Sequence, residues 1–231
     1  MDKAGQFLRD WAENFQQKVP VDYSLIVQFN IRPGPVTWHV VVEPGRPVQI
    51  ASGAHPNAQV IFYTTEETLQ MIYEGKMTAL TAAAKARMSD SAPLDFRLGE
   101  GVELTPALKA KLFFFVQSFF NRSTPERIPL AEEHARKVHG ALAIPLYYHP
   151  GFRSAWYLVK KGERLNEPGD TNPFPQAFVF ISGEGYAKIG DKIVPVRAGE
   201  AYYIPPGSDH VVWTESDHPL ELIFLAWGEG A

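Results

Sequence analysis

His210 has the clearest potential for chemistry in the C-terminal third of the chain. The segment before it reads GEAYYIPPGSDH and carries two glycines and two prolines, Gly199, Pro205, Pro206 and Gly207. The glycines permit tight turns and the prolines stiffen the corner between two strands, so His210 opens the next strand. Because side chains alternate along a strand, we expect His210 to face the interior, where an imidazole can serve as an acid–base group or a metal ligand.

Other catalytic and binding classes find no support in the sequence. The chain has no cysteine, which excludes disulfides, thiolate nucleophiles and zinc–thiolate sites. No phosphate loop, G-x-S-x-G or H-E-x-x-H occurs. A net charge of -4, from 22 basic and 26 acidic residues, argues against nucleic-acid binding. The N-terminus does not read as a signal peptide, and no apolar run approaches the roughly 18 residues of a membrane span. We therefore expect a soluble, cytoplasmic protein with no integral membrane segment.

The elements that would position His210 are short strands. From residue 141 onward, turns recur every eight to ten residues, which is the pattern of an antiparallel sandwich or barrel. The polar, charged segment 122–140 precedes this region and is the expected linker between domains. The expected strands are 177–181, 186–189, 193–196, 201–204, 210–213 and 220–227.

The segment from Gly199 to His210 resembles the second motif of the cupin family, G-x5-P-x-G-x2-H, at every fixed position. Upstream, Gln176 lies seven residues before Gly183, as an acid or Gln does at the end of the first cupin motif. The resemblance covers about 80 residues and implies a double-stranded β-helix barrel. It also implies a metal site, which in the family usually consists of two His, one Glu and a final His.

The positions that match this metal site are Asp170, Asn172, Gln176 and His210, so only the last histidine is retained. Neutral amide oxygens are weak ligands for transition metals. A register shifted by two residues would instead place Asn172 and Phe174 at the two histidine positions. We expect no cofactor at this site; a divalent metal held by Asp170, Gln176 and His210 is the alternative.

Three interpretations of the barrel follow. It has lost its metal and binds an organic ligand with the remaining polar groups, or it holds an unusual metal, or it is purely structural. Aromatic residues are frequent in the region, which favours an apolar pocket, although each ring taken singly is more often part of a core. The candidate ligand-binding residues are His210, Gln176, Asn172, Tyr202, Phe178 and Trp156.

The N-terminal region has mixed patterning. Apolar spacing predicts an amphipathic helix over 3–18 and a second helix after Thr65, which can cap it. A third, alanine-rich helix is expected over 78–86, and a phenylalanine-rich helix over 104–121 should be buried on more than one side. Strands are expected at 23–29, 36–42, 48–50, 58–63 and 94–98, the first four as an antiparallel meander.

This order of elements resembles the sterol carrier protein type 2 family, together with the segments HPNAQVIF at 55–62, TEETL at 65–69 and IYEGK at 72–76. The resemblance covers about 100 residues. It implies an α/β sandwich with an apolar tunnel for a fatty acyl chain or a sterol. The phenylalanine-rich helix is then either a tunnel wall or a helix that packs on several partners at once.

The sequence therefore predicts an α+β protein: a sterol-carrier-like domain over 1–121, a linker over 122–140 and a cupin β-barrel over 141–231. The leading hypothesis is a non-enzymatic binding protein for an apolar or amphipathic, lipid-like small molecule. The alternative is a cupin enzyme (an isomerase, hydrolase or dioxygenase) that acts on a hydrophobic substrate through His210 with Asp170 and Gln176. A homodimer is expected because cupin barrels often pair.

Overall fold

The computed structural model of the protein describes residues 3–87, 89–121 and 126–231. The chain forms two compact units. The N-terminal unit comprises Met1–Ala83 and Ser91–Ile128, and the C-terminal unit comprises Ala84–Asp90 and Pro129–Ala231. The predicted linker 122–140 therefore contributes elements to the second unit, and a short segment from the first half of the sequence also belongs there.

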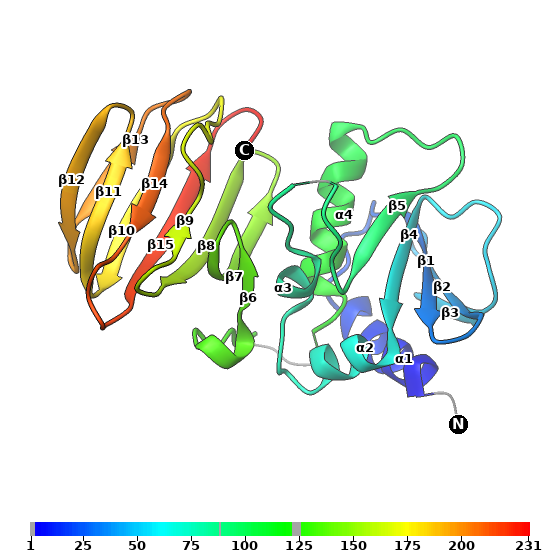
Figure 1. Cartoon of the computed structure of the whole chain (residues 1–231). Helices are drawn as coiled ribbons and strands as arrows, with labels where there is room; N and C mark the ends of the chain where they lie inside the picture. Colours follow the sequence, from blue (N-terminus) through cyan, green and yellow to red (C-terminus); the bar gives the residue numbers. More distant parts are fainter. Residues whose placement is uncertain (1–2, 88, 122–125) are drawn as a thin grey trace. The chain divides into compact units, whose positions relative to one another are not determined.

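The N-terminal unit combines helices with a five-stranded sheet, as predicted (Figure 1). Thr65 and Thr105 cap two of the helices, and each side-chain oxygen accepts a backbone hydrogen bond from the first turn. The helices are α1 (Lys3–Gln16), α2 (Glu66–Tyr73), α3 (Ala79–Ala83) and α4 (Pro106–Ser118); the strands are β1 (Leu25–Arg32), β2 (Val36–Val42), β3 (Gln49–Ser52), β4 (Val60–Thr65) and β5 (Asp95–Leu98).

The strand order of this sheet is β3-β2-β1-β4-β5. The first three strands form the expected antiparallel meander, but β4 pairs with β1 in parallel, so the prediction of a four-stranded meander is wrong at this point. The burial pattern explains the difference. Strand β3 is short and mostly exposed, whereas alternate residues of β4 are fully buried and need a central position.

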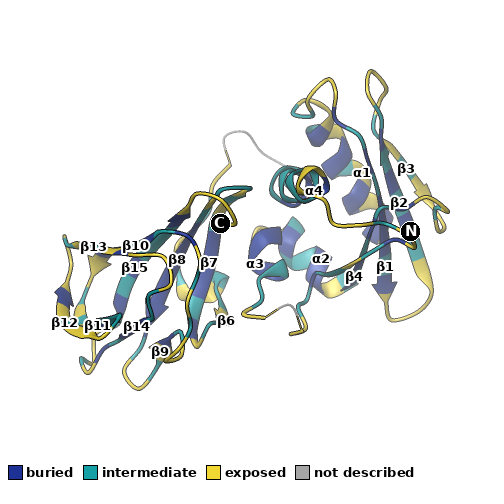
Figure 2. Cartoon of the chain, turned by 90° about the horizontal axis from the view of Figure 1, so that it is seen from above, coloured by how far each residue is buried: buried dark blue, intermediate teal, exposed yellow. Residues whose placement is uncertain are grey.

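An aromatic cluster joins the helices to one face of this sheet, and Figure 2 colours much of α1 and β1 as buried. The rings of Phe115 and Phe119 stack at 4.5 Å, and Phe119 also contacts Trp11 of α1 and Phe29 of β1. Phe113 and Phe114 of α4 are only half-buried. The phenylalanine-rich helix therefore uses its rings to pack on the sheet and on α1 at once.

The C-terminal unit consists of two antiparallel sheets, with strand orders β13-β10-β15-β8-β7-β6 and β12-β11-β14-β9. The strands are β6 (Arg136–Val138), β7 (Ala141–His149), β8 (Phe152–Val159), β9 (Arg164–Leu165), β10 (Gln176–Ser182), β11 (Glu184–Ile189), β12 (Lys192–Arg197), β13 (Ala201–Ile204), β14 (His210–Trp213) and β15 (Leu220–Trp227), with a short helix η1 (Glu132–His134) before β6. The inner faces of both sheets form one hydrophobic core, which includes Tyr157, Phe178, Phe180, Val212 and Leu222. The part of the chain that the structure describes has no helix long and apolar enough to span a membrane.

Candidate functional site

His210 is the first residue of β14 and is 2% exposed. It lies two residues before Val212, which belongs to the core, so its side chain points to the interior face of the sheet as alternation predicts. The ring lies 6.0 Å from that of Phe178, and its Nδ1 is 3.1 Å from the Ser208 carbonyl oxygen. The structure thus places one imidazole at the end of the core, oriented by a backbone carbonyl.

The loop before β14 and the loop before β10 meet at this end of the sheets. The backbone N–H of Gly207, from the loop before β14, donates to the Asn172 carbonyl at 2.7 Å. The Asn172 side chain in turn donates to Gln176 Oε1 at 3.4 Å. Asp170 lies just upstream, where its carboxylate accepts a 2.9 Å hydrogen bond from the backbone N–H of Glu167. These contacts bring Asn172, Gln176 and Asp170 to the region of His210.

His139 is a further residue of this region that the sequence did not single out. It adopts a left-handed backbone with φ of 56°, as does Asn166 with φ of 65°, and no other non-glycine residue in the described ranges has a positive φ. Asn166 joins the two histidines: its backbone N–H donates to the His139 carbonyl at 2.8 Å, and its side chain donates to the His210 carbonyl at 3.0 Å. Left-handed backbone at non-glycine residues is uncommon and clusters at functional sites.

These residues line one open pocket with a volume of about 780 Å³. His139, Asn166, Asp170, Asn172 and His210 all contribute to its wall. The charged side chains around them are Arg87, Lys137 and Arg164, and Asp90, Glu163 and Glu167. A wall of this kind suits a polar ligand better than the apolar one that the aromatic content suggested.

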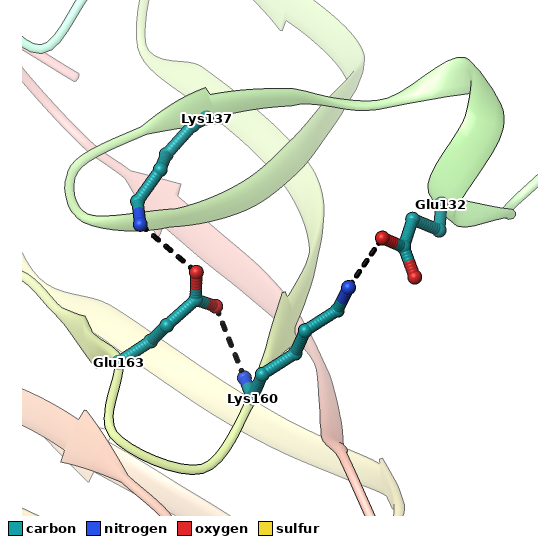
Figure 3. Close-up of polar contacts among 4 residues, drawn as sticks. All are labelled: Glu132, Lys137, Lys160 and Glu163. Atoms are coloured by element: carbon teal, nitrogen blue, oxygen red, sulfur yellow. Dashed lines mark hydrogen bonds and ion pairs between the residues drawn. The ribbon is translucent and has the colours of Figure 1, made fainter.

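A set of charge-assisted contacts fixes one edge of this pocket (Figure 3). Lys137 from β6 donates to Glu163 Oε1 at 2.9 Å, and the other oxygen of Glu163 accepts the backbone N–H of Lys160 at 3.2 Å. The Lys160 side chain pairs with Glu132 of η1. The segment 132–137, predicted as linker, is therefore tied to the turn after β8, and it positions His139.

Burial determines the protonation of both histidines. It lowers the pKa of His210, against the opposing effects of the Ser208 carbonyl and of the Asp170 and Asp209 carboxylates. It also lowers the pKa of His139, where the Asp170 carboxylate opposes the effect and the charge of His210 reinforces it. Both imidazoles are thus held neutral at neutral pH, when each can donate one hydrogen bond and accept another.

The donor set here does not fit a transition metal. Asp170 supplies one carboxylate, and His210 and His139 supply imidazoles from separate elements, while Asn172 and Gln176 are amides already bonded to each other. The described residues contain no group of three His, Asp or Glu side chains arranged to hold a metal ion. The chemistry that these side chains themselves supply is hydrogen bonding and proton transfer.

The other predicted ligand-binding residues do not line this pocket. Phe178 is fully buried and packs beside the His210 ring. Tyr202 bonds to the Pro195 carbonyl and to Glu200, both at 3.1 Å, and lines a separate pocket of about 770 Å³. Trp156 lies between Ala155 and Tyr157 of the core, so it points to the opposite face of β8, and its indole N–H donates to Glu221 at 3.1 Å. The structure therefore groups His210, Asn172, Gln176 and Phe178 and separates Tyr202 and Trp156 from them.

Comparison with known proteins bears on part of the C-terminal unit. Residues 162–226 match the family model described as Cupin domain. A comparison with curated proteins gave no match. The family match does not extend to the N-terminal unit, whose resemblance to the sterol carrier protein type 2 family stays a prediction.

Similar solved structures include a Cupin 2 conserved barrel domain protein from Salinispora arenicola, with 22% identity over 46% of this chain and 91% of that chain and a TM-score of 0.41. An RmlC-like cupin from Shewanella frigidimarina has 17% identity over 40% and 80% of the two chains, with a TM-score of 0.36. A protein from Thermotoga maritima described as a predicted oxalate decarboxylase has 16% identity over 38% and 79%, with a TM-score of 0.36.

Proposed function

From a C-terminal unit whose residues 162–226 form a cupin domain, we propose that this unit binds a small polar molecule in the pocket beside His210. The observation that carries the proposal is the convergence of a buried imidazole, a second histidine and two asparagines, Asn166 and Asn172, on one open pocket. His210 and Asn172 would hydrogen-bond the ligand, and Phe178 would support the His210 ring from the core.

The test is a set of ligand titrations followed by thermal unfolding and calorimetry. The compounds are monosaccharides, nucleosides, amino acids, small carboxylic acids and oleate, because the sequence predicted an apolar or amphipathic ligand. A compound present at 100 times its Kd stabilises the protein by about 2.7 kcal/mol. We expect His210→Gln to abolish the stabilisation and His149→Gln, at an exposed histidine outside the pocket, to leave it unchanged.

The proposal fails if no polar compound binds, or if binding is the same in wild type and His210→Gln. If oleate binds with equal affinity to the wild type and to His210→Gln, the N-terminal unit becomes the expected site of a lipid-like ligand. What supports a lipid there is the sterol-carrier resemblance. What opposes it is the aromatic cluster that fills the space between α1, α4 and the sheet.

A second candidate function is acid–base catalysis on the bound molecule, and the lowered pKa of His210 favours it. A neutral imidazole at physiological pH can accept a proton from a substrate, and the imidazolium that forms on His210 can return the proton to another atom of the bound molecule. Mass spectrometry of each binding compound after prolonged incubation distinguishes the two functions. A chemical change that His210→Gln prevents indicates an enzyme, whereas an unchanged compound indicates a binding protein.

A further inference from the structure

Two long polar side chains lie on the interior face of the six-stranded sheet, in one row across three strands. Arg153 of β8 is paired with Ala226 of β15, and Ala226 is paired with Gln176 of β10. Gln176 lies two residues before Phe178, which is in the core, so this row faces the interior. Directly opposite residues share a face, so Ala226 is the residue that lies between Arg153 and Gln176 in this row.

Each of these side chains has a buried nitrogen without a partner. Gln176 is fully buried, and its Nε2 makes no hydrogen bond to any described residue. The Nε of Arg153 is likewise buried and unbonded, although its Nη2 donates to the Gly230 carbonyl at 3.1 Å. Buried polar groups are nearly always hydrogen-bonded, because an unsatisfied donor costs the full desolvation free energy. Two such donors in one row indicate that an acceptor is missing.

The charge of Arg153 points to the nature of that acceptor. Among the residues that the structure describes, no carboxylate forms an ion pair with this guanidinium. Neighbouring strands are about 4.8 Å apart, so the two backbones are separated by about 10 Å, a span that long side chains and a group with two oxygens can bridge. Phe174 packs against Ala226, and its ring centroid lies 5.5 Å from the guanidinium carbon, so the row has an apolar neighbour.

We infer that Arg153 and Gln176 bind the carboxylate of an organic acid, in which one oxygen accepts from the guanidinium Nε–H and the other from the Gln176 amide. This inference rests on the proposed function, since it assigns the chemical class of the ligand of the His210 pocket. The connection is Asn172, which lines that pocket and donates to Gln176. Arginine is the side chain that pairs best with a planar carboxylate, and the apolar surroundings strengthen the contact.

The experiment uses two carboxylates and their neutral isosteres, acetate with acetamide and benzoate with benzamide, on the whole chain. Nuclear magnetic resonance follows the Nε–H signal of Arg153, the side-chain amide of Gln176 and the His210 ring, while calorimetry measures Kd. We expect saturable shifts of the first two signals with the carboxylates and at least tenfold weaker binding of the amides.

Three variants complete the test. We expect Gln176→Glu to abolish carboxylate binding, because the new carboxylate forms an ion pair with the Arg153 guanidinium and repels the anion. Arg153→Lys should weaken binding at least tenfold, since it keeps the charge but loses the Nε–H. Arg197→Lys, at an exposed arginine of β12, should leave Kd unchanged. Since Gln176→Glu is nearly isosteric, it remains informative if Arg153→Lys does not fold.

Three results would overturn the inference. Equal binding of acids and amides would show that no anion site exists. Shifts at His210 without shifts at Arg153 and Gln176 would refute the carboxylate but leave the proposed function standing. A cross-peak from both unbonded groups to a buried water, with no response to either acid, would show that water satisfies the donors.

Discussion

Asn166 shows how a single residue shapes the wall of the His210 pocket. Its backbone turns left-handed at φ of 65°, and from that conformation it bonds the carbonyls of both His139 and His210. Asparagine tolerates this region better than most residues because its short amide can satisfy nearby backbone groups. The residue therefore links the turn between β6 and β7 to the start of β14, at the cost of some backbone strain.

Replacement of Asn166 separates its two contributions. We expect Asn166→Ala to lower the free energy of unfolding by about 2 kcal/mol, since it leaves the His210 carbonyl unpaired and keeps the unfavourable backbone. Asn166→Gly should cost less, because glycine adopts a positive φ freely. Urea denaturation of the two variants measures the difference, and a larger loss for glycine would contradict this account.

The histidines make stability depend on pH with a definite sign. Burial lowers the pKa of His210 and His139 below their ordinary 6.5. As the pH falls through 6.5, the unfolded chain therefore binds protons that the folded chain does not, and the free energy of unfolding decreases. A histidine pKa that is lower by 1 in the folded chain than in the unfolded chain reduces the free energy of unfolding by about 1.4 kcal/mol at a pH below both pKa values.

We expect urea denaturation between about pH 7.5 and pH 5 to show this loss of stability for the C-terminal unit. The variant His210→Gln should have a shallower dependence, because one of the two buried histidines no longer titrates. The control His149→Gln should follow the wild type. A slope that is unchanged in His210→Gln would show that the acid sensitivity arises elsewhere.

At the scale of elements, close packing of α1 on β2 depends on a glycine. A β-carbon added at Gly5 would overlap the Trp38 ring, with Cη2 at only 2.7 Å. Alanine normally stabilises a helix relative to glycine by about 1 kcal/mol, but overpacking of a core costs about 1–3 kcal/mol. We expect Gly5→Ala to destabilise the N-terminal unit for this reason.

A double-mutant cycle tests the contact directly. Trp38→Leu removes the ring that the added methyl group would strike, so Gly5→Ala should be neutral or stabilising in that background. Chemical denaturation of the four proteins gives the coupling free energy. Additive effects of the two substitutions would mean that the helix shifts to accommodate the methyl group.

The bounds of helices and strands could be predicted from the sequence better than the pairing of the strands. Helix α4 begins at Pro106 after its Thr105 cap, close to the predicted start, because caps and apolar spacing are local signals. Strand β14 begins at His210, as the turn before it predicts. Strand β4 pairs in parallel with β1, which is distant in the sequence. This pairing depends on which strand needs a buried neighbour on each side, and the apolar pattern within one strand does not reveal it.

The candidate site around His210 could likewise be predicted only in part from the sequence. His210, Asn172 and Gln176 belong to motifs and could be found, whereas His139 lies in a charged segment that reads as linker. It reaches the pocket only because β6 pairs with β7 and Asn166 bonds its carbonyl. Tyr202, a predicted ligand-binding residue, lies opposite Phe178, but its hydroxyl bonds Glu200 in another pocket, which the register and the turns determine.

The whole molecule should unfold in two steps, because each unit has its own sheet and core. We expect calorimetry to resolve two transitions, of which Gly5→Ala lowers only one and Asn166→Ala only the other. A common shift of both transitions in either variant would show that the two units unfold cooperatively.

The segment 84–90 gives the chain an unusual connectivity. The chain leaves the N-terminal unit after Ala83, contributes this segment to the C-terminal unit and returns at Ser91. The segment is held there by the guanidinium of Arg136, which donates to the Ala84 carbonyl at 3.1 Å, and by the pair of Arg87 with Glu167. During synthesis, these two partners emerge from the ribosome 52 and 80 residues later, so the C-terminal unit can be completed only by capturing a loop of a domain that has already been made. A single protease cut near residue 128, between the two units, would give an N-terminal fragment that still carries residues 84–90 of the C-terminal unit.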